Sequence, residues 1–219
     1  MDKVNVLSID IGISNLGFVW GNITFDPEDY TKERNYYKKN IINYLLDKSI
    51  FQRNIQIMDC NRINITNVKH NKVKLCDCTL RHDSCIPDYL DHFIQEHMNM
   101  FDDSDIILLE RQPPAGITNV QDLLFTRFRD KVLLVSPNSV HKYFNMSKDY
   151  DTRKIESEQI SSLFLCTFRG FIKNMRKHDI SDSLLMIIYY YHTRFEEISR
   201  SIPRLSSQNI IDLESFRYC

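Results

Sequence analysis

Apolar residues recur along the first part of the chain with the period of β-strands. Residues 4–9 are rich in β-branched side chains and predict a strand that ends at Asp10. A turn follows, and residues 16–20 predict a second strand, so the two strands should form a hairpin. The near-continuous apolar run at residues 105–110 is typical of a central, buried strand, and residues 131–136 predict a further strand.

The rest of the pattern adds polar strands and several helices. Residues 55–66 and 73–79 predict strands towards the edge of a sheet. Apolar side chains at helical spacing predict a helix over residues 87–100 and a short one over 121–128. Residues 145–157 are polar and predict a loop, after which helices dominate as far as residue 201. Elements in this order predict a mixed α/β fold.

One segment of different character interrupts this pattern at residues 26–50. Asp26 can cap a helix and Pro27 suits a first helical position, so we predict a helical insertion there. Residues 206–219 are expected to form a C-terminal tail. The 219 residues suit one domain of generous size with a substantial core, and we expect a single domain over residues 1–219.

The charge is distributed unevenly along the chain. The formal net charge is −1, but residues 1–126 carry −5 and residues 127–205 carry +5, which gives weak support for a polyanionic partner. No charged segment precedes a long apolar run at the start, and the longest late apolar run is too short to span a bilayer. We therefore expect a soluble, intracellular protein without a membrane partner.

The six cysteines are expected to be reduced in an intracellular protein. Cys76, Cys78, His82 and Cys85 form a cluster that could hold zinc. Structural zinc sites, however, use cysteines separated by at least two residues, and Cys-x-Cys fits that spacing poorly. Small buried thiols are therefore the favoured interpretation of this cluster.

Carboxylates occupy three places where solubility alone does not explain them. Asp10 follows one apolar strand, Glu110 follows another, and Asp179 and Asp182 precede an apolar helical run. Parallel strands that end together would bring Asp10 and Glu110 to one edge of a sheet. Two acids three residues apart at a helix start lie on one face. Four ionised carboxylates in one pocket need compensating cations, and oxygen ligands favour Mg²⁺ or Mn²⁺.

The ordered motifs SIDIGISNLGF, LLERQ and HDISDSLL resemble the RuvC-type Holliday junction resolvases of the RNase H and retroviral integrase superfamily. The hairpin and the triplet Glu110-Arg111-Gln112 are most similar to the mitochondrial and poxvirus branch. The resemblance runs from Asp10 to about His192. It implies an α/β, RNase H-like fold, in which helices flank a central mixed five-stranded sheet.

The resemblance also implies the chemistry. Asp10, Glu110, Asp179 and Asp182 would be catalytic and would hold two Mg²⁺ or Mn²⁺ ions about 4 Å apart. One ion would activate a water and the other would stabilise the leaving 3′ oxygen, so the products would carry 5′-phosphate and 3′-OH ends.

The implied substrate is branched DNA, above all the four-way junction. A junction is nearly two-fold symmetric and needs two matched nicks, so we expect a homodimer. Residues 189–191 and Phe195 are candidate dimer contacts. In a virus, such an enzyme would act in DNA recombination and concatemer resolution, at replication sites in the host cytoplasm and in the virion. The residues expected to contact DNA are Lys154 first and Lys148 second, then Lys142, Arg153, Arg176, Lys177 and Gln112.

Two further features bear on these expectations. Bacterial members of the family have aromatic residues after the Glu-x-Gln element that stack on bases, whereas Pro113 and Pro114 stand here. Any opening of the junction must therefore use other groups. His178 could be a general acid or support a ligand, but a helix-entry residue is the favoured interpretation, and we expect His192 at the surface or in an interface.

Three other functions fit parts of the sequence. Sugar kinases and actin-like ATPases also begin with a strand, Asp-x-Gly and a hairpin, but this chain lacks their second glycine-rich phosphate loop, so we expect no nucleotide cofactor. A non-catalytic DNA-binding module on the same fold would not need all four acids. RNA–DNA hybrids or DNA flaps could replace the junction as substrate, because a fold does not determine a substrate.

Overall fold

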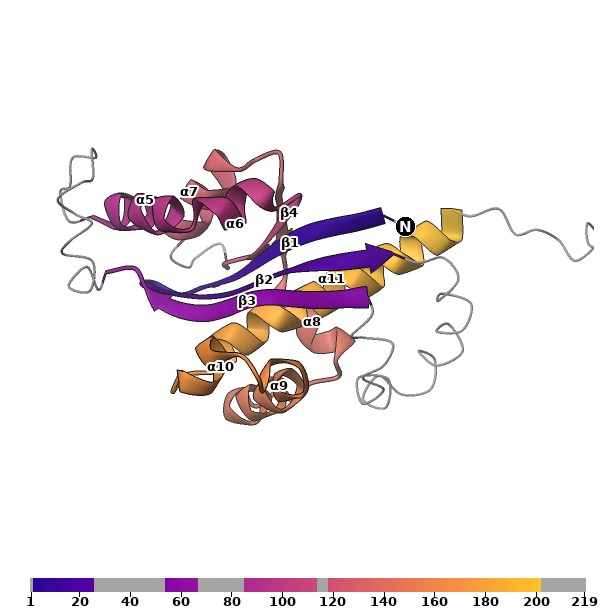
Figure 1. Cartoon of the computed structure of the whole chain (residues 1–219). Coiled ribbons are helices and arrows are strands. Elements are labelled where there is room, and N and C mark those ends of the chain that lie inside the picture. The colour runs from indigo at the N-terminus through magenta and orange to yellow at the C-terminus, as the bar shows by residue number, and fades with distance from the viewer. Residues whose placement is uncertain (1, 26–53, 67–84, 114–117, 202–219) are drawn as a thin grey trace, which may run out of the picture.

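The computed structural model describes residues 2–25, 54–66, 85–113 and 118–201. Five strands form one mixed sheet in the order β3-β2-β1-β4-β5, which confirms the five-stranded sheet expected from the sequence (Figure 1). The strands are β1 (Asp2–Ile11), β2 (Asn15–Phe25), β3 (Ile55–Asn64), β4 (Ile106–Glu110) and β5 (Val132–Val135). The first three pair antiparallel, whereas β1, β4 and β5 run parallel.

The β1–β2 hairpin is longer than the apolar pattern predicted. Asp10 lies within β1 rather than after it, because its backbone still pairs with Gly17 on β2. The turn closes where the Gly12 N–H donates to the carbonyl of Asn15 at 2.9 Å. A Cβ on residue 12 would also lie 2.9 Å from that oxygen, so the tight turn favours glycine.

Three helices cover one face of the sheet (Figure 1). They are α5 (Ile86–Glu96), α6 (Met98–Asp103) and α7 (Asn119–Arg127). The single helix predicted over 87–100 is thus two helices, because the backbone leaves the helical region at His97 (φ −117°, ψ 22°). Their apolar side chains, such as Phe93, Phe101 and Leu124, form one core with the sheet residues on that face.

Four helices cover the other face: α8 (Pro137–Tyr143), α9 (Tyr150–Leu165), α10 (Arg169–Lys173) and α11 (His178–Ser201). The prediction of a loop over residues 145–157 was wrong from Tyr150 onwards. The helix begins there because the Asp149 carboxylate accepts the Thr152 N–H at 2.9 Å, an N-cap that a search for apolar periodicity overlooks. The helix α8 was also missed.

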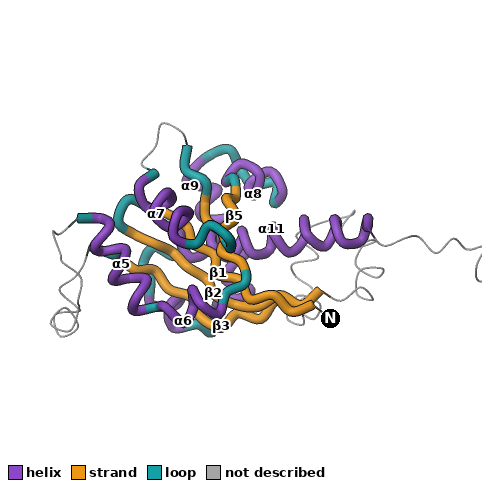
Figure 2. Tube along the Cα trace, turned by 90° about the horizontal axis from the view of Figure 1, so that it is seen from above, coloured by secondary structure: helices purple, strands orange, loops and turns teal. Residues whose placement is uncertain are grey.

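The long helix α11 crosses this face and supplies much of the second core (Figures 1 and 2). Ile180, Leu184, Ile187 and Ile188 are at most 1% exposed. Tyr191 is fully buried and its hydroxyl accepts from Asn54 at 3.0 Å, so the expectation that it contributes to a dimer surface was wrong.

His192 was also placed wrongly by the sequence. It is 5% exposed and stacks on Tyr143 with ring centroids 5.6 Å apart. The helical period puts it beside Tyr191, on the part of α11 that faces the core.

Several sequence predictions concern residues outside those described. They are the insertion at 26–50, the strand at 73–79, the tail at 206–219, and three of the four residues of the cysteine cluster. Cys85, the fourth, is exposed. None of the described helices is both long and apolar enough to cross a membrane.

Candidate active site

Two of the predicted acids meet at one edge of the sheet. The parallel strands β1 and β4 pair Ile9 with Leu109, which makes Asp10 and Glu110 the next positions along each strand. Their carboxyl groups lie close enough for Glu110 to raise the pKa of Asp10. The two acids are therefore brought together by strand register, as the sequence predicted.

The start of α11 brings the other two acids over the same edge. Gly17, which pairs with Asp10, contacts the first turn of this helix. A Cβ at residue 17 would overlap the Asp179 carbonyl, so the absence of a side chain allows the helix to approach the sheet. Asp179 and Asp182 then lie on adjacent turns, near the helix N-terminus where negative charge is favourable.

Ser183 ties these three elements together, and the sequence did not single it out. Its hydroxyl accepts the Asp10 N–H at 3.0 Å and donates to the Gly17 carbonyl at 2.8 Å. The side chain is fully buried. Ser183 therefore fixes the spacing between β1, β2 and α11 at the level of the acids.

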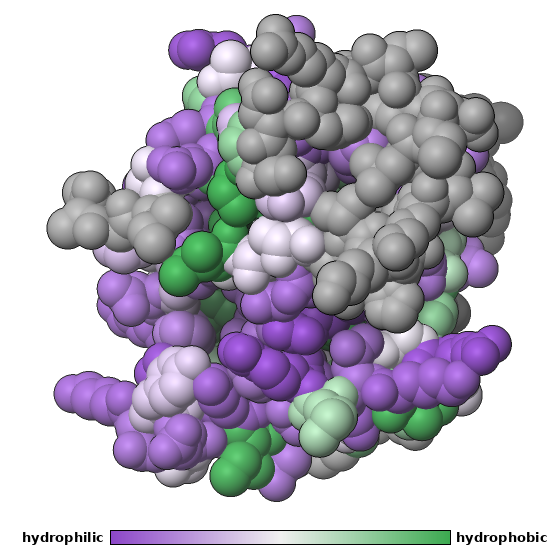
Figure 3. Space-filling model, turned by 90° about the vertical axis from the view of Figure 1, so that its left-hand side faces the viewer, coloured by the Kyte–Doolittle hydropathy of each residue, from purple (hydrophilic) through white to green (hydrophobic). Residues whose placement is uncertain are grey.

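The four acids line one cavity of about 180 Å³. We call Asp10, Glu110, Asp179 and Asp182 the acidic floor. The side chains around them are mostly basic or aromatic, and Tyr150, Arg153, Lys154 and Arg176 are called the basic rim. The remaining lining residues are His141 and His178. Figure 3 views this side of the molecule, where hydrophilic residues dominate the middle and lower part.

The acidic floor is electrostatically costly. Burial raises the pKa of Asp10 well above its usual value, and the neighbouring Glu110, Asp182 and Asp179 raise it further. Burial and Glu110 raise the pKa of Asp182 to about 7, although a hydrogen bond from Ser157 and the charge of Arg153 oppose the shift. Bound cations would stabilise the ionised form of these groups.

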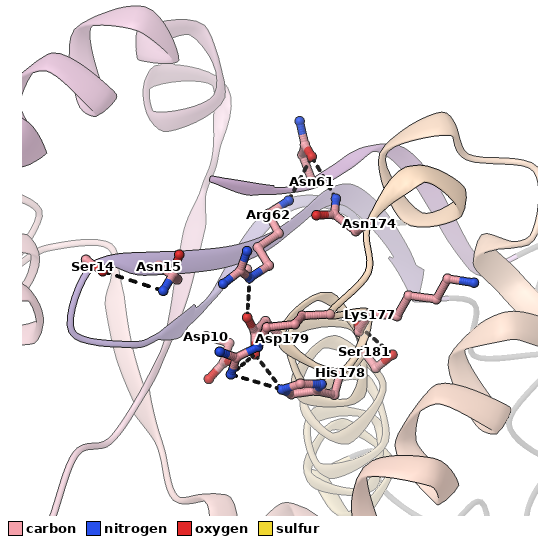
Figure 4. A network of polar contacts seen from close by, with 12 residues as sticks. Asp10, Ser14, Asn15, Asn61, Arg62, Asn174, Lys177, His178, Asp179 and Ser181 are labelled. Carbon is pink, nitrogen blue, oxygen red and sulfur yellow. Dashed lines mark hydrogen bonds and ion pairs between the residues drawn. The ribbon is translucent and has the colours of Figure 1, made fainter. Parts of the chain in front are cut away.

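Asp179 differs from the other three acids because two arginines and a histidine lie around its carboxylate (Figure 4). Arg62 on β3 donates from Nε to one carboxylate oxygen at 2.5 Å. His178 Nε2 and Arg176 lie 3.0 and 3.7 Å from the other oxygen. Burial lowers the pKa of His178, while Asp179 opposes that shift. His178 therefore belongs to the cavity, which goes beyond the helix-entry role favoured from the sequence.

The donor set matches a hard divalent cation. Four carboxylates supply only oxygen, which Mg²⁺ and Mn²⁺ prefer, and a divalent charge would relieve their mutual repulsion. Among the described residues, no three His, Cys, Asp or Glu side chains lie close enough together to coordinate a metal ion in this conformation. Asp179 is instead directed towards its cationic partners.

The predicted DNA-contacting residues fall into two groups. Arg153, Lys154 and Arg176 line the cavity, and the other three basic residues do not. Lys142 and Lys148 are exposed, and Lys177 lies over the Phe171 ring at 5.3 Å.

Gln112 faces the acidic floor. Its side-chain nitrogen donates to Glu110 at 2.9 Å and to the Ile11 carbonyl at 3.0 Å. It therefore orients Glu110 and ties β4 to the end of β1.

Tyr150 is the aromatic member of the rim, and no sequence pattern distinguished it. It is 57% exposed at the first position of α9. The Lys154 Nζ lies 3.9 Å from its ring centroid, and the Arg153 guanidinium carbon lies 5.6 Å from it. The ring thus holds two cations beside the cavity.

Comparisons with known proteins identify the fold. No protein-family profile matches the chain, and no curated protein matches it in sequence. The structure of the fowlpox virus resolvase in complex with substrate Holliday junction DNA superposes with a TM-score of 0.52 at 14% identity, over 87% of this chain and 98% of that one. A second structure, of the fowlpox virus Holliday junction resolvase, gives 0.51 at 13% identity, over 86% and 99%. The chain therefore has the RNase H-like fold of these resolvases, as the sequence predicted.

Proposed function

We propose that this chain is a metal-dependent endonuclease that cuts four-way DNA junctions and other branched DNA. The proposal rests mainly on one observation: acids from β1, β4 and α11 line the same cavity as the side chains of the basic rim. Acids alone would repel a phosphodiester, and a basic rim alone would only bind it. A site that both binds DNA and hydrolyses it needs the two together.

The acidic floor is the proposed metal site. Asp10, Glu110, Asp179 and Asp182 would hold two Mg²⁺ or Mn²⁺ ions, which would supply a nucleophilic water and stabilise the leaving 3′ oxygen. Ser183 and Gln112 support this site by fixing the Asp10 backbone and the Glu110 carboxylate. The resulting nicks would carry 5′-phosphate and 3′-OH ends.

The basic rim is the proposed site for the DNA backbone. Lys154 and Arg153 lie on α9 beside the cavity, and Arg176 precedes α11 on the same cavity wall. These positions would place a phosphate between the rim cations and the floor. His141 and His178 also line the cavity, and burial lowers the pKa of each, so both would be neutral near pH 7.

The choice of a junction over other DNA rests on the fold. The fowlpox virus protein that shares the fold was solved with Holliday junction DNA as its substrate. A nearly symmetric junction needs paired nicks, so we propose that two copies of the chain act together. A role in viral recombination and concatemer resolution would follow from this activity.

The test is cleavage of a synthetic four-way junction in Mg²⁺ or Mn²⁺. Wild type is compared with Asp182→Asn and with the control Asp130→Asn, which removes an exposed acid that does not line the cavity. We expect paired symmetric nicks from wild type and the control. The Asp182 variant should lose more than about 100-fold in rate, since even partners of metal ligands cost 10–100-fold, while it still binds the junction.

Linear duplex, a flap and an RNA–DNA hybrid serve as the other substrates. Metal-dependent cutting of the hybrid or flap alone would keep the site but replace the junction as the substrate. Binding without cutting of any substrate by folded wild type would leave a DNA-binding module.

A further inference from the structure

Three positions form a row across the sheet beneath the start of α11. β1 pairs Asp10 with Gly17, and β2 pairs Gly17 with Arg62 on β3. Side chains of directly paired residues project from the same face of a sheet. The row therefore places Asp10 and Arg62 on either side of Gly17, which has no side chain and leaves a space between them.

Asp179 occupies the space above Gly17, between Asp10 and Arg62. Because Gly17 has no side chain, the backbone of Asp179 packs directly on it. The Asp179 carboxylate then reaches Arg62, whose Nε donates to it at 2.5 Å, while Asp10 lies on the other side (Figure 4). The side chains of Arg62 and Asp179 are 18% and 12% exposed, so this ion pair is largely shielded from water.

The backbone that carries Arg62 is held in place. The Asn61 side-chain oxygen accepts the Arg62 N–H at 2.8 Å and also accepts from Asn174 at 3.2 Å. Asn174 in turn donates to the Gly170 carbonyl at 2.6 Å, and α10 packs so closely on β3 that a Cβ at Gly170 would overlap the Cys60 carbonyl. Arg62 is therefore fixed behind Asp179 by the contact between β3 and α10.

The second arginine at Asp179 is placed differently. Arg176 is 3.7 Å from Asp179, its side chain is 55% exposed, and it lines the cavity. Arg176 can turn to a phosphate in the cavity, whereas Arg62 lies outside the lining and has no such freedom. Arg62 therefore stays paired with Asp179, and its positive charge repels any cation that binds to the acidic floor.

We propose that Arg62 is a positioning residue for Asp179 that also sets the divalent-ion affinity of the acidic floor. It fixes the direction of the Asp179 carboxylate and offsets the negative charge of that group. The cluster can then fold without a metal ion, but it binds an added cation less tightly than four unpaired acids would. This inference rests on the proposed metal site.

The sign of the effect on ion affinity separates this role from simple orientation. A neutral partner that only orients a ligand strengthens metal binding, so its removal weakens affinity by about 10–100-fold. Removal of a fixed positive charge beside the site should do the opposite. Arg62→Gln should therefore tighten divalent-ion binding even though it disturbs Asp179.

The experiment measures Mn²⁺ binding to the whole chain without DNA, by calorimetry, together with thermal unfolding in EDTA. The variants are Arg62→Gln, which removes the charge, and Arg62→Lys, which keeps the charge but loses the guanidinium geometry. Arg129→Gln is the control, because Arg129 is exposed and contacts only the Phe125 ring among the described interactions.

We expect Arg62→Gln to bind Mn²⁺ at least about tenfold more tightly, which is about 1.4 kcal/mol, because it removes a unit charge a few ångströms from the site. Its midpoint of unfolding in EDTA should fall by about 5 °C or more, because a largely buried acid loses its partner. Arg62→Lys should keep the wild-type affinity within about threefold but cut DNA more slowly, and Arg129→Gln should match wild type throughout.

Unchanged or weaker Mn²⁺ binding by Arg62→Gln would overturn the inference. If Arg62→Gln does not fold in EDTA but folds when Mn²⁺ is added, the inference is supported, because the ion then replaces the missing charge. Wild type that binds no divalent ion would overturn the proposed function as well. Wild type that binds Mn²⁺ and cuts junctions, with affinity unaffected in Arg62→Gln, would overturn the role of Arg62 alone.

Discussion

The acidic floor and the basic rim face each other across one cavity, yet they are built in different ways. The floor depends on strand register and on the contact of α11 with Gly17. Hydrogen bonds of Ser183 with Asp10 and Gly17, and of Gln112 with Glu110, hold it in place. The rim lies on the first turns of α9 and on the segment before α11, and its side chains are partly exposed. The floor is buried, hydrogen-bonded and destabilised by like charges, whereas the rim side chains are more exposed.

This difference suits the two tasks proposed for the site. Metal ions require ligands within a few tenths of an ångström, so the groups that hold them belong on a braced sheet edge. A phosphate backbone is bound mainly by charge, which tolerates movement. Substitution of a residue that holds the floor in place should therefore reduce the cleavage rate sharply. Substitution of a rim cation should reduce DNA affinity only moderately.

Among residues that support the floor without belonging to it, the largest effect on cleavage is expected from removal of the Ser183 hydroxyl. Ser183→Ala leaves the buried Asp10 N–H and Gly17 carbonyl without this partner. We expect the free energy of unfolding to fall by about 1–3 kcal/mol and cleavage to fall by about 10–100-fold. Chemical denaturation and junction cleavage measure the two.

Ser162→Ala is the matched control, because Ser162 is exposed on α9 and, among the described residues, its hydroxyl donates to the Gln159 carbonyl of the same helix. It should change neither quantity appreciably. A normal cleavage rate in a clearly destabilised Ser183→Ala would show that the floor does not need this brace.

The next effect concerns how the free energy of unfolding depends on pH, because the acids of the floor are buried close together. The pKa of Asp182 is raised to about 7, so the folded protein binds a proton more tightly than the unfolded chain does between about pH 4 and pH 7. The contribution of Asp182 to stability is therefore full below about pH 4 and is lost as pH rises to 7. The loss is on the order of 1 kcal/mol per pH unit within this window.

Urea unfolding in EDTA at several pH values tests this expectation. Asp182→Asn cannot ionise, so it should gain stability relative to wild type as pH rises through the window. A difference between the two proteins that stays constant with pH would mean that Asp182 is an ordinary, solvated acid.

The smallest effect is expected at the rim. Lys154→Gln removes one cation beside the cavity, so junction affinity should fall by less than about tenfold. The slope of log affinity against log salt should decrease in magnitude by about one. Binding is measured by fluorescence anisotropy at several salt concentrations.

Lys148→Gln provides the comparison, since Lys148 is exposed and does not line the cavity. If both substitutions weaken binding equally and leave the cleavage rate of bound junction unchanged, the rim has no special position among the basic residues. A larger loss in cleavage than in binding for Lys154→Gln would place that lysine closer to the reaction.

The sequence predicted the floor better than the rim for a physical reason. An acid that ends or nearly ends an apolar strand can be recognised from local pattern, and parallel strands then bring such acids together. Asp10 and Glu110 were found in this way. Tyr150 lies in a segment whose polar residues suggested a loop, because the apolar periodicity of α9 is weak and its start depends on the cap at Asp149.

Arg62 and Ser183 could not be predicted from the sequence for a different reason. Arg62 belongs to a polar strand, and only the register of β3 on β2 shows that it faces Gly17. Ser183 lies among the apolar residues of α11, where a small hydroxyl usually has no particular role. Both depend on contacts between segments more than 100 residues apart, which no local pattern encodes.

Gly17 illustrates how tolerance to substitution can differ from chemical importance. It has no functional group, yet any side chain there would overlap the Asp179 carbonyl and lift α11 away from the sheet. In a library that replaces every residue in turn, position 17 should therefore be as intolerant as the acids themselves. A survey that ranks positions by the reactivity of their side chains would miss Gly17, although its lack of a side chain allows β1, β2 and α11 to pack together.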